Sequence, residues 1–546
     1  MRCKFLIGTL FCLLTFHPLL ANSGVDFSFF KDKPQSLAKD FYIYEYLQKE
    51  SATPEEAKAL FGMVHTMNLR FFHLFAKKMN DPEFQKISSC LDLDITRLMK
   101  EDDACLNIGI NISKLTSLPK SQLSYIKPRI QNETLKRLIS LMESENVYES
   151  ALKSDTETFL SLYNGSITTY KLANFNQFPI PKEHLDRLSN HPRFNQLVYN
   201  TIQNEKLETM QKALLSVEPS LHVNSKSLFY LGLNALKYNE KSKALAFFEH
   251  AIERAKKQEE KDKALFWQYL TSHNAHYLQK LSQSNDINIY ALFAFETLGI
   301  PLKNIISPSL QGRHPSFEVS DPFAWTKEIN KVYTMNTKEI EAFARSFEYA
   351  NTLPHYCYLM ERATRYSKHY YPIPYAEEIA HYSLHRQALM LAIARQESRF
   401  LPSVVSTSYA LGMMQFMPFV ARDIAKKEKL DSFDISAMFD PRVAYLFGNI
   451  HLNFLERNLM HPLFVAYAYN GGIGFTKRHL QAGAFSQNAY EPFWSMEKMV
   501  NEESREYGKK VLANYVVYRQ LLGDTVSINN LFEMLLIPSA SDRFRN

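Results

Sequence analysis

The sequence predicts an all-α protein in which an N-terminal superhelix of packed helices precedes a C-terminal domain with tighter turns. Glycine is scarce, at 16 of 546 residues, about 3% against a usual ~7%, although the hairpins and bulges of sheet proteins need it. Eight glycines lie in the first 400 residues and eight in the last 146. Residues 24–310 also repeat apolar side chains at helical spacing, without a strong two-residue alternation. These observations argue against a β-rich chain, a dinucleotide fold or a phosphate-binding loop.

Residues 1–23 are predicted to be a secretory signal peptide. Arg2 and Lys4 precede an apolar stretch at 5–16, and small residues at 21–23 offer a cleavage site. The apolar stretch is shorter than the ~20 residues that span a membrane, although an uncleaved anchor is the alternative. Because Arg2 and Lys4 leave with the signal, the formal net charge falls from +6 to +4, too mild a balance to indicate nucleic acid.

The stretch 227–270 has the clearest helical pattern of the N-terminal part. Apolar residues recur every three or four positions in 227–238, a polar turn follows at 239–242, and 244–255 resumes the helical period. This unit resembles a tetratricopeptide-type hairpin, with small alanines at the crossing positions. A helical hairpin cannot bury its apolar face alone, so neighbours must stack on it. We therefore expect an α-superhelical domain over 24–310, either a structural frame or a concave surface for a partner.

Two proline-rich breaks divide the rest of the chain. Residues 301–325 carry four prolines and are expected to form a loop, after which 326–370 return to helical patterns. The second break, Tyr371-Pro-Ile-Pro-Tyr, disfavours the α conformation before each proline, so we expect no helix to cross it. The predicted units are a helical linker domain at 311–370 and a last domain at 371–546.

Three cysteines lie outside the signal, and none forms a CxxC pair, so a zinc or thioredoxin-type site is not expected. Cys90 and Cys105 are fifteen positions apart. In an oxidising compartment they can form a local disulfide, and two buried thiols are the alternative. Cys357 is expected to be a buried thiol. We expect neither a metal nor a cofactor.

A strong helix is predicted from His385 to Glu397. Its residues are largely apolar, and Ser398-Arg-Phe-Leu-Pro ends it, so Glu397 lies in the last turn. A carboxylate there faces the negative end of the helix dipole, and apolar walls would raise its pKa by desolvation. Both effects favour the protonated form near neutral pH, as a general acid for glycosidic-bond cleavage requires. Taken alone, an exposed helix-end glutamate would be the simpler interpretation.

Three sequence blocks give this glutamate a context. Ala394-Arg-Gln-Glu-Ser-Arg-Phe-Leu-Pro is followed by Ser406-Thr-Ser-Tyr-Ala-Leu-Gly-Met-Met-Gln-Phe-Met-Pro and then by Ala466-Tyr-Ala-Tyr-Asn-Gly-Gly-Ile-Gly. Their order and spacing resemble the catalytic domain of the soluble lytic transglycosylases, periplasmic enzymes with a lysozyme-like fold. The stretch 503–512 resembles that family's C-terminal stretch. The resemblance is sharp over about 371–520, and looser upstream, where the family has an α-superhelical domain.

The resemblance implies cleavage of the β-1,4 bond between N-acetylmuramic acid and N-acetylglucosamine in peptidoglycan, ending in a 1,6-anhydromuramoyl product. One carboxylate suffices if the substrate's own N-acetyl oxygen stabilises the developing oxocarbenium ion. Glu397 would donate its proton to the leaving oxygen and then accept one from the muramoyl C6 hydroxyl. No second acidic residue is near Glu397 in sequence, since Asp423 and Asp440 look like helix and turn positions.

The resemblance also implies substrate contacts from the second block. Ser406 would bond the N-acetyl region or Glu397, and its alternative is a turn or cap serine. Gln415 would orient the sugar amide, and its alternative is a buried structural glutamine. Met417 would line the floor of the groove, or belong to the core. Tyr409 stands where the family usually has glycine, so it would narrow the groove or add a stacking face.

The later blocks supply the remaining implied contacts. Tyr469 would approach Glu397 and the oxocarbenium ion from across the groove. Asn470 would hold that loop or bind substrate, and the glycines at 471–474 would permit the turn that follows. Glu497 matches a family position that meets the ammonium-bearing peptide stem, and a solvated surface carboxylate is its alternative.

The sequence-based hypothesis is therefore a periplasmic lytic transglycosylase, a lyase that acts as a monomer on peptidoglycan strands and binds no nucleic acid. One alternative is a hydrolytic muramidase on the same fold, which would need a base or nucleophile to use water. Another is a helical scaffold of a cell-wall synthesis or secretion assembly with weak catalysis.

Overall fold

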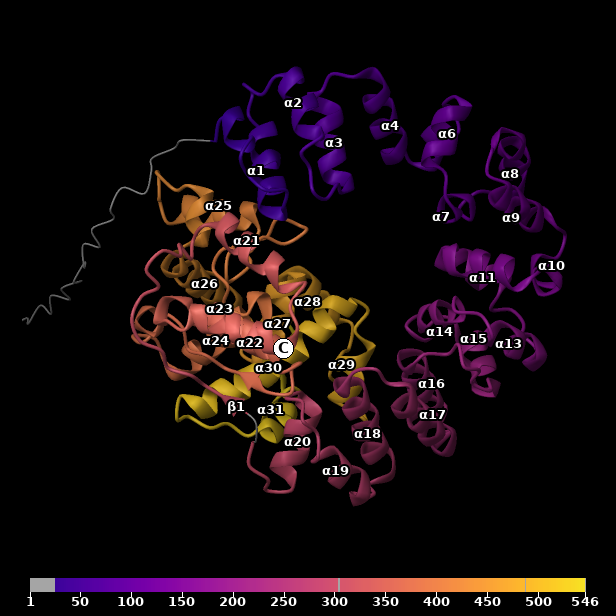
Figure 1. The fold of residues 1–546 in the computed structure, drawn as a ribbon. Helices are drawn as coiled ribbons and strands as arrows, with labels where there is room; N and C mark the ends of the chain where they lie inside the picture. The colour runs from indigo at the N-terminus through magenta and orange to yellow at the C-terminus, as the bar shows by residue number, and fades with distance from the viewer. Residues whose placement is uncertain (1–24, 303–304, 487, 546) are drawn as a thin grey trace, which may run out of the picture.

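The computed structural model describes residues 25–302, 305–486 and 488–545, and the chain is helical almost throughout (Figure 1). The all-α fold class is therefore confirmed. The predicted signal peptide at 1–23 lies outside the described residues. Within the described ranges, no helix has the length and apolar character needed to span a lipid bilayer.

The first part of the chain is an array of short helices. Many begin at an Asn, Asp or Ser whose side chain accepts a hydrogen bond from the first turn, as Ser36 and Asn224 do, and such caps stabilise short helices. The helices of the array are α1 (Leu37–Leu47), α2 (Pro54–Phe61), α3 (Leu69–Lys78), α4 (Pro82–Asp92), α5 (Ile95–Leu98), α6 (Asp103–Gly109), α7 (Ile112–Leu115), α8 (Lys120–Ile126), α9 (Glu133–Glu143), α10 (Val147–Lys153), α11 (Thr156–Gly165), α12 (Thr168–Asn174), α13 (Lys182–Ser189), α14 (Phe194–Ile202), α15 (Glu208–Ala213), α16 (Ser225–Lys237), α17 (Lys241–Arg254), α18 (Gln258–Ser272), α19 (Ala275–Leu281) and α20 (Ile289–Thr297).

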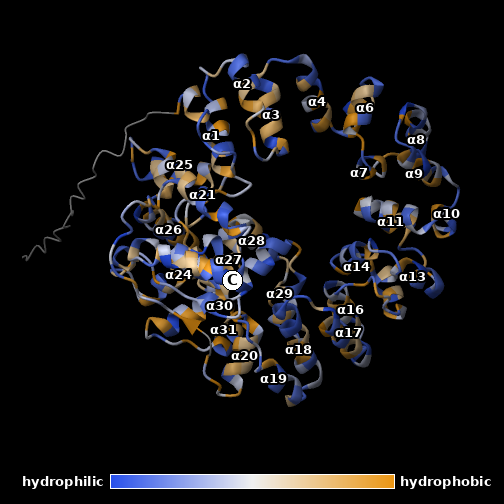
Figure 2. Ribbon diagram, viewed as in Figure 1, coloured by the Kyte–Doolittle hydropathy of each residue, from blue (hydrophilic) through white to orange (hydrophobic). Residues whose placement is uncertain are grey.

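The helix–turn–helix pattern at 227–255 corresponds to α16 and α17. A side chain at Gly232 would lie 2.3 Å from the Phe248 ring, so glycine lets the two helices approach closely where they cross. The rings of Phe229 and Trp267 lie 6.1 Å apart and both are buried. These aromatic side chains belong to the core. In Figure 2 the helices of the array mix hydrophilic and hydrophobic residues, as amphipathic helices do.

A small helical unit connects the array to the last domain. Strand β1 (Ile305–Ile306) pairs in parallel with β2 (His369–Tyr370), and the chain between them forms α21 (Pro322–Val332), α22 (Thr337–Ala344) and α23 (Leu353–Ala363). No helix crosses the proline break at 371–375, as expected from its sequence.

The last part of the chain packs around one buried helix, α24 (Leu384–Ser398), whose residues 387–395 are all buried. Asn514 ties this helix to α30, since its Nδ2 donates to the Ala392 carbonyl at 3.3 Å. The other helices are α25 (Pro418–Lys427), α26 (Pro441–Glu456), α27 (Pro462–Gly471), α28 (Ile473–Gln481), α29 (Phe493–Lys498), α30 (Glu502–Leu521), α31 (Ile528–Met534) and α32 (Pro538–Ser541).

The array runs round in a ring, and its first helices return to the last domain beside α25 (Figure 1). Glu45 of α1 forms an ion pair with Arg422 of α25. The Tyr42 hydroxyl donates to the Ser436 hydroxyl at 3.2 Å, and the Tyr42 ring stacks on Phe323 of α21 at 5.9 Å. Helix α1 therefore contacts both the connecting unit and the last domain.

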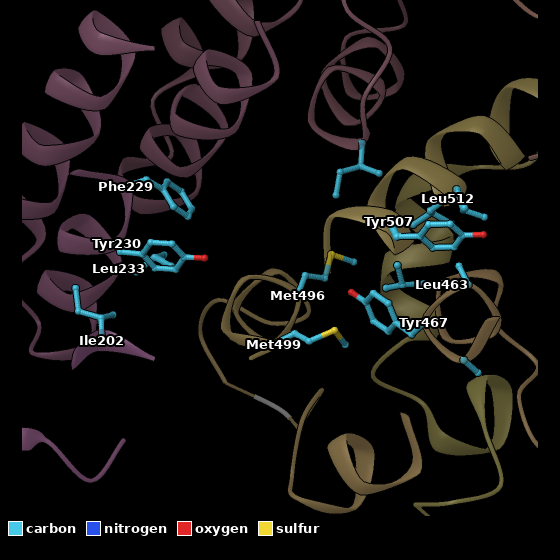
Figure 3. Packing of buried hydrophobic residues seen from close by; sticks show 14 of the residues in the cluster. Ile202, Phe229, Tyr230, Leu233, Leu463, Tyr467, Met496, Met499, Tyr507 and Leu512 are labelled. Carbon is cyan, nitrogen blue, oxygen red and sulfur yellow. The ribbon is translucent and has the colours of Figure 1, made fainter. Parts of the chain in front are cut away.

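A second junction joins the array to the last domain through α29. Figure 3 shows Phe229 and Tyr230 of α16 on one side of Met496, with Tyr467 of α27 and Tyr507 of α30 on the other side. All five side chains belong to one continuous cluster of buried apolar residues. Because burial of apolar surface favours association, this cluster fixes α29 and α30 against the array.

The described cysteines occupy buried positions. Cys90 of α4 and Cys105 of α6 form a disulfide, and Cys357 of α23 is a free thiol. A side chain at Gly109 would lie 2.3 Å from the Cys90 carbonyl oxygen. Helices α4 and α6 therefore approach closely next to the bridge.

Candidate active site

Glu397 lies in the last turn of α24, as the sequence predicts for that helix. Arg399 and Phe400 follow with φ angles of +55° and +63°, the left-handed conformation that commonly ends helices. The Arg399 backbone N–H bonds back to the last turn. The helix therefore ends at Ser398, one residue after Glu397, whose side chain is half-buried and follows the buried stretch 387–395.

Burial and two neighbours on α30 set the pKa of Glu397. The Tyr507 hydroxyl donates a hydrogen bond to Oε1 of Glu397 at 2.7 Å. Desolvation raises the pKa of Glu397 to about 7, the Tyr507 bond opposes that rise, and the charge of Glu503 adds to it. A carboxyl with this pKa can both give and take a proton near neutral pH.

Tyr469 and Asn470 lie at the end of α27, and Tyr469 is near enough to Glu397 to be affected by its charge. Helices α27 and α30 approach closely at Gly508, where any side chain would lie 2.2 Å from the Tyr467 ring. Burial, and then the charge of Glu397, raises the pKa of Tyr469 well above its usual range, so the phenol stays protonated. Its hydroxyl donates to the Met414 carbonyl at 2.8 Å.

Asn470 is tied to α30 from both ends of its amide. Its Nδ2 donates to Oε1 of Glu503 at 3.2 Å, and its Oδ1 accepts from the Ser504 hydroxyl at 2.7 Å. A side chain at Gly471 would lie 2.5 Å from that same hydroxyl. Glycine after Asn470 therefore permits the close approach that fixes the end of α27 against α30.

The loop at 402–417 forms a wall next to Glu397. The Ser398 hydroxyl donates to the Met413 carbonyl at 2.7 Å, which attaches the loop to the residue after the glutamate. Gly412 has a φ of +71°, and a side chain there would lie 2.0 Å from the Met438 carbonyl oxygen. Only glycine fits this position without a shift of the backbone.

Ser406, Gln415 and Met417 all lie on or next to this wall and are half-buried. The Ser406 hydroxyl accepts from the Ala410 backbone at 2.9 Å and so closes a turn. The Gln415 amide donates to the Gly412 carbonyl at 2.7 Å. Met417 immediately precedes α25. In the described structure, Ser406 and Gln415 therefore make the contacts of turn and loop residues.

Glu497 lies outside this group. It is 1% exposed in α29, its carboxylate pairs with Lys509 at 3.0 Å, and it accepts a hydrogen bond from the Tyr290 hydroxyl. Tyr290 belongs to α20, so Glu497 joins α29 and α30 to the array. A buried carboxylate with these partners is not open to a peptide stem in this structure, nor is it a solvated surface group.

Two members of the site were not assigned a role from the sequence. Glu503 and Tyr507 are one turn apart on α30 and more than 100 residues from Glu397. Only the general resemblance of the stretch 503–512 pointed to this helix. Among the described residues, no group of three or more His, Cys, Asp or Glu side chains has the arrangement to hold a metal ion.

Known proteins match this part of the chain. Residues 374–490 match the family model of the transglycosylase SLT domain, and this range includes Glu397, Tyr469 and Asn470. Over 170 residues the chain is 29% identical to the soluble lytic murein transglycosylase of Escherichia coli, which covers 30% of this chain and 26% of that enzyme. It is also 37% identical over 102 residues to the membrane-bound lytic murein transglycosylase C of Edwardsiella ictaluri. That match covers 17% of this chain and 28% of the relative. The chain thus spans about a quarter of the length of these relatives.

The fold is similar to a solved structure over a longer range. An inactive mutant of the lytic transglycosylase Slt from Pseudomonas aeruginosa matches with a TM-score of 0.52 over 90% of this chain and 83% of that chain, at 15% identity. This likeness concerns the fold alone. It extends beyond the matched domain into the helical array, since the domain occupies only residues 374–490.

Proposed function

We propose that this chain, a member of the soluble lytic murein transglycosylase family through its SLT domain at residues 374–490, cleaves peptidoglycan strands with Glu397 as acid and then base. The observation that carries the proposal is the placement of Glu397 in the last turn of α24 within the SLT domain, where Tyr507 donates to its carboxylate at 2.7 Å and burial raises its pKa to about 7. A carboxyl group of this kind can protonate a leaving oxygen and still deprotonate a hydroxyl afterwards.

In the first step, Glu397 donates its proton to the oxygen that links C1 of N-acetylmuramic acid to C4 of N-acetylglucosamine. The C1–O bond breaks, and the N-acetylglucosamine end leaves as a free hydroxyl. The positive charge that develops at C1 is stabilised by the N-acetyl oxygen of the same muramoyl residue. No second carboxylate is needed as a nucleophile.

In the second step, the Glu397 carboxylate accepts the proton of the muramoyl C6 hydroxyl. The C6 oxygen attacks C1 and closes the 1,6-anhydro ring, so Glu397 is again protonated. Because attacking and attacked atoms belong to one sugar, the reaction profits from a high effective molarity. Tyr507 holds Oε1 of the carboxylate in place through the 2.7 Å hydrogen bond.

The substrate contacts belong to the same proposal. Tyr469 faces the charge at C1, Asn470 holds the end of α27 or bonds the sugar, and Ser406, Gln415 and Met417 line the wall at 402–417. The reaction takes place in the periplasm, where the predicted signal at 1–23 would deliver the chain and where peptidoglycan lies. We propose that the chain acts there as a monomer.

The test is mass spectrometry of purified peptidoglycan digested by the chain without its signal. The proposal predicts products that are lighter by one water than hydrolytic products, and none from Glu397→Gln with an unchanged circular dichroism spectrum. Reducing muramic ends would instead identify a hydrolytic muramidase. If wild-type chain and Glu397→Gln rescued a deletion strain equally well, the scaffold alternative would hold.

A further inference from the structure

Tyr409 has a backbone conformation that large side chains rarely adopt. Its φ is +66°, in the left-handed region, where a bulky residue is an outlier. Gln415 in the same loop has a φ of +51°. Such a backbone conformation is strained and persists only where surrounding contacts impose it.

The contacts that hold Tyr409 come from the opposite end of the chain. The residue is 2% exposed. The prediction that Tyr409 narrows the groove or offers a stacking face to a sugar is therefore wrong. Its ring lies 6.3 Å from Phe41 and 5.2 Å from Tyr44, both in α1, and 5.9 Å from Phe71 in α3. Tyr409 thus inserts into an aromatic pocket of the N-terminal helices.

A neighbouring polar contact joins the same two segments. Asn68, which caps α3, donates from Nδ2 to the Thr407 carbonyl at 3.4 Å. The turn that follows is closed inside the loop, since the Tyr409 backbone N–H donates to the Ser406 carbonyl at 2.9 Å. The N-terminal helices therefore contact this turn at two points, the Thr407 carbonyl and the Tyr409 side chain.

Hydrogen bonds also attach the loop that carries Tyr409 to two neighbours of Glu397, Ser398 and Tyr469. Leu411 exchanges backbone hydrogen bonds with Phe416, of 2.9 and 3.0 Å, so the segment between them forms a tight turn. That segment carries the Met413 carbonyl, bound by the Ser398 hydroxyl next to Glu397, and the Met414 carbonyl, bound by Tyr469. A shift of the loop would therefore displace Ser398 and Tyr469, the two residues that connect it to the surroundings of Glu397.

We propose that Tyr409 is a positioning residue, through which α1 and α3 hold the 402–417 wall of the active site in its productive shape. The catalytic domain of this chain is thus complete only when the helical ring closes on it. The inference rests on the proposed function for its kinetic consequence, but the mechanical link between α1, α3 and the loop is independent of the reaction catalysed.

The first test compares Tyr409→Gly with Tyr409→Phe. Glycine suits a φ of +66° and relieves the backbone strain, so this variant loses only the anchoring ring, whereas phenylalanine keeps it. We expect hydrogen exchange, measured by mass spectrometry, to accelerate in the 402–417 peptides of Tyr409→Gly and to stay at the wild-type rate in Tyr409→Phe. Phe178→Gly removes an exposed aromatic ring elsewhere in the array and is the matched control.

The second test approaches the contact from the other side. Phe71→Ala should reproduce the exchange pattern of Tyr409→Gly, and the double variant should add little, because both changes break one contact. Misplacement of catalytic groups by about 1 Å can lower a rate about 100-fold. We therefore expect kcat/KM on peptidoglycan to fall at least tenfold in Tyr409→Gly and in Phe71→Ala, and to stay at the wild-type value in Tyr409→Phe.

The outcomes separate the two proposals. Unchanged loop exchange and unchanged kcat/KM in Tyr409→Gly would overturn the positioning role, whatever the products of the wild-type chain. Accelerated exchange with a wild-type chain that makes no anhydro product would instead refute the proposed function and keep the mechanical link. Accelerated exchange with full activity would show that the loop needs no anchoring, which also overturns the proposal.

Discussion

At the scale of single residues, the proton affinity of Glu397 determines the proposed chemistry. Its pKa is raised to about 7, chiefly by desolvation, so the acid form needed for the first step is depleted at higher pH. We predict that kcat/KM falls about tenfold per pH unit above pH 7. Rates on one peptidoglycan preparation at constant ionic strength will test this. An alkaline limb at the ordinary glutamate value of 4.5 would contradict the role of burial.

Two neighbours of Glu397 should move that alkaline limb in opposite directions. The Tyr507 hydrogen bond lowers the pKa of Glu397 and the charge of Glu503 raises it. Tyr507→Phe should therefore shift the limb to higher pH, and Glu503→Gln to lower pH. Glu502→Gln is a matched control, since its carboxylate pairs with Lys226 at 2.6 Å. Tyr507→Phe and Glu503→Gln should still form anhydro ends, and an alkaline limb that stays at the wild-type pH in both would contradict these contributions to the pKa of Glu397.

The same pKa shift predicts how Glu397 affects stability. Its pKa is about 7 in the folded chain and about 4.3 in an unfolded one. Because the folded value is higher, stability is full below about pH 4 and is lost as the pH rises toward 7. At pH 8, the free energy of unfolding of Glu397→Gln should therefore exceed that of the wild type by up to about 3 kcal/mol. The variant should accordingly unfold at a higher temperature.

The control for that comparison is the same measurement at low pH. At pH 4 both side chains are neutral, so the thermal midpoints should coincide in calorimetry. Equal midpoints at pH 8 as well would show that Glu397 is solvated rather than desolvated.

At the scale of elements, a buried ion pair joins α29 to α30, and the hydrogen bond from Tyr290 to Glu497 joins this pair to the array. Lys509 and Glu497 are both nearly inaccessible and lie 3.0 Å apart, and Lys509 also pairs with Glu506 at 3.0 Å, so removing Lys509 takes a cation from two carboxylates. We predict that Lys509→Met lowers the free energy of unfolding by about 3 kcal/mol, and that adding Glu497→Gln recovers part of the loss. Urea unfolding followed by fluorescence measures both.

An exposed pair supplies the comparison for this prediction. Lys182 and Asp186 form an exposed ion pair one turn apart on α13, and exposed pairs of this kind contribute little to stability. If Lys509→Met cost no more than Lys182→Met, Glu497 would not be the interhelical tie described above.

Elements set by local patterns could be predicted from the sequence. The helix predicted from His385 to Glu397 is α24, because helical periodicity and a proline-terminated end are properties of neighbouring residues. The burial of Glu497 could not be predicted, since its partner Tyr290 is 207 positions away. The hydrogen bond from Tyr507 to Glu397 spans 110 positions and has no local signature either.

At the scale of the whole molecule, the first helices of the array meet the last domain at the active-site loop. The helical array was predictable from scarce glycine and repeated apolar spacing, but its closure was not. The side chains that close it, Tyr42, Glu45 and Tyr409, are ordinary residues of helices and turns in the sequence. Tyr409, at a position where the family usually has glycine, suggests an altered groove from the sequence. In the structure its side chain instead contacts α1 and α3.

The central claim is that one carboxylate cleaves the strand while water takes no part. Digestion of peptidoglycan in oxygen-18-labelled water, followed by mass spectrometry of the new muramoyl ends, tests it most directly. The account predicts anhydro ends without the heavy isotope, and no new ends at all with Glu397→Gln. Reducing ends that carry oxygen-18 at C1 would contradict it, because they require attack by water.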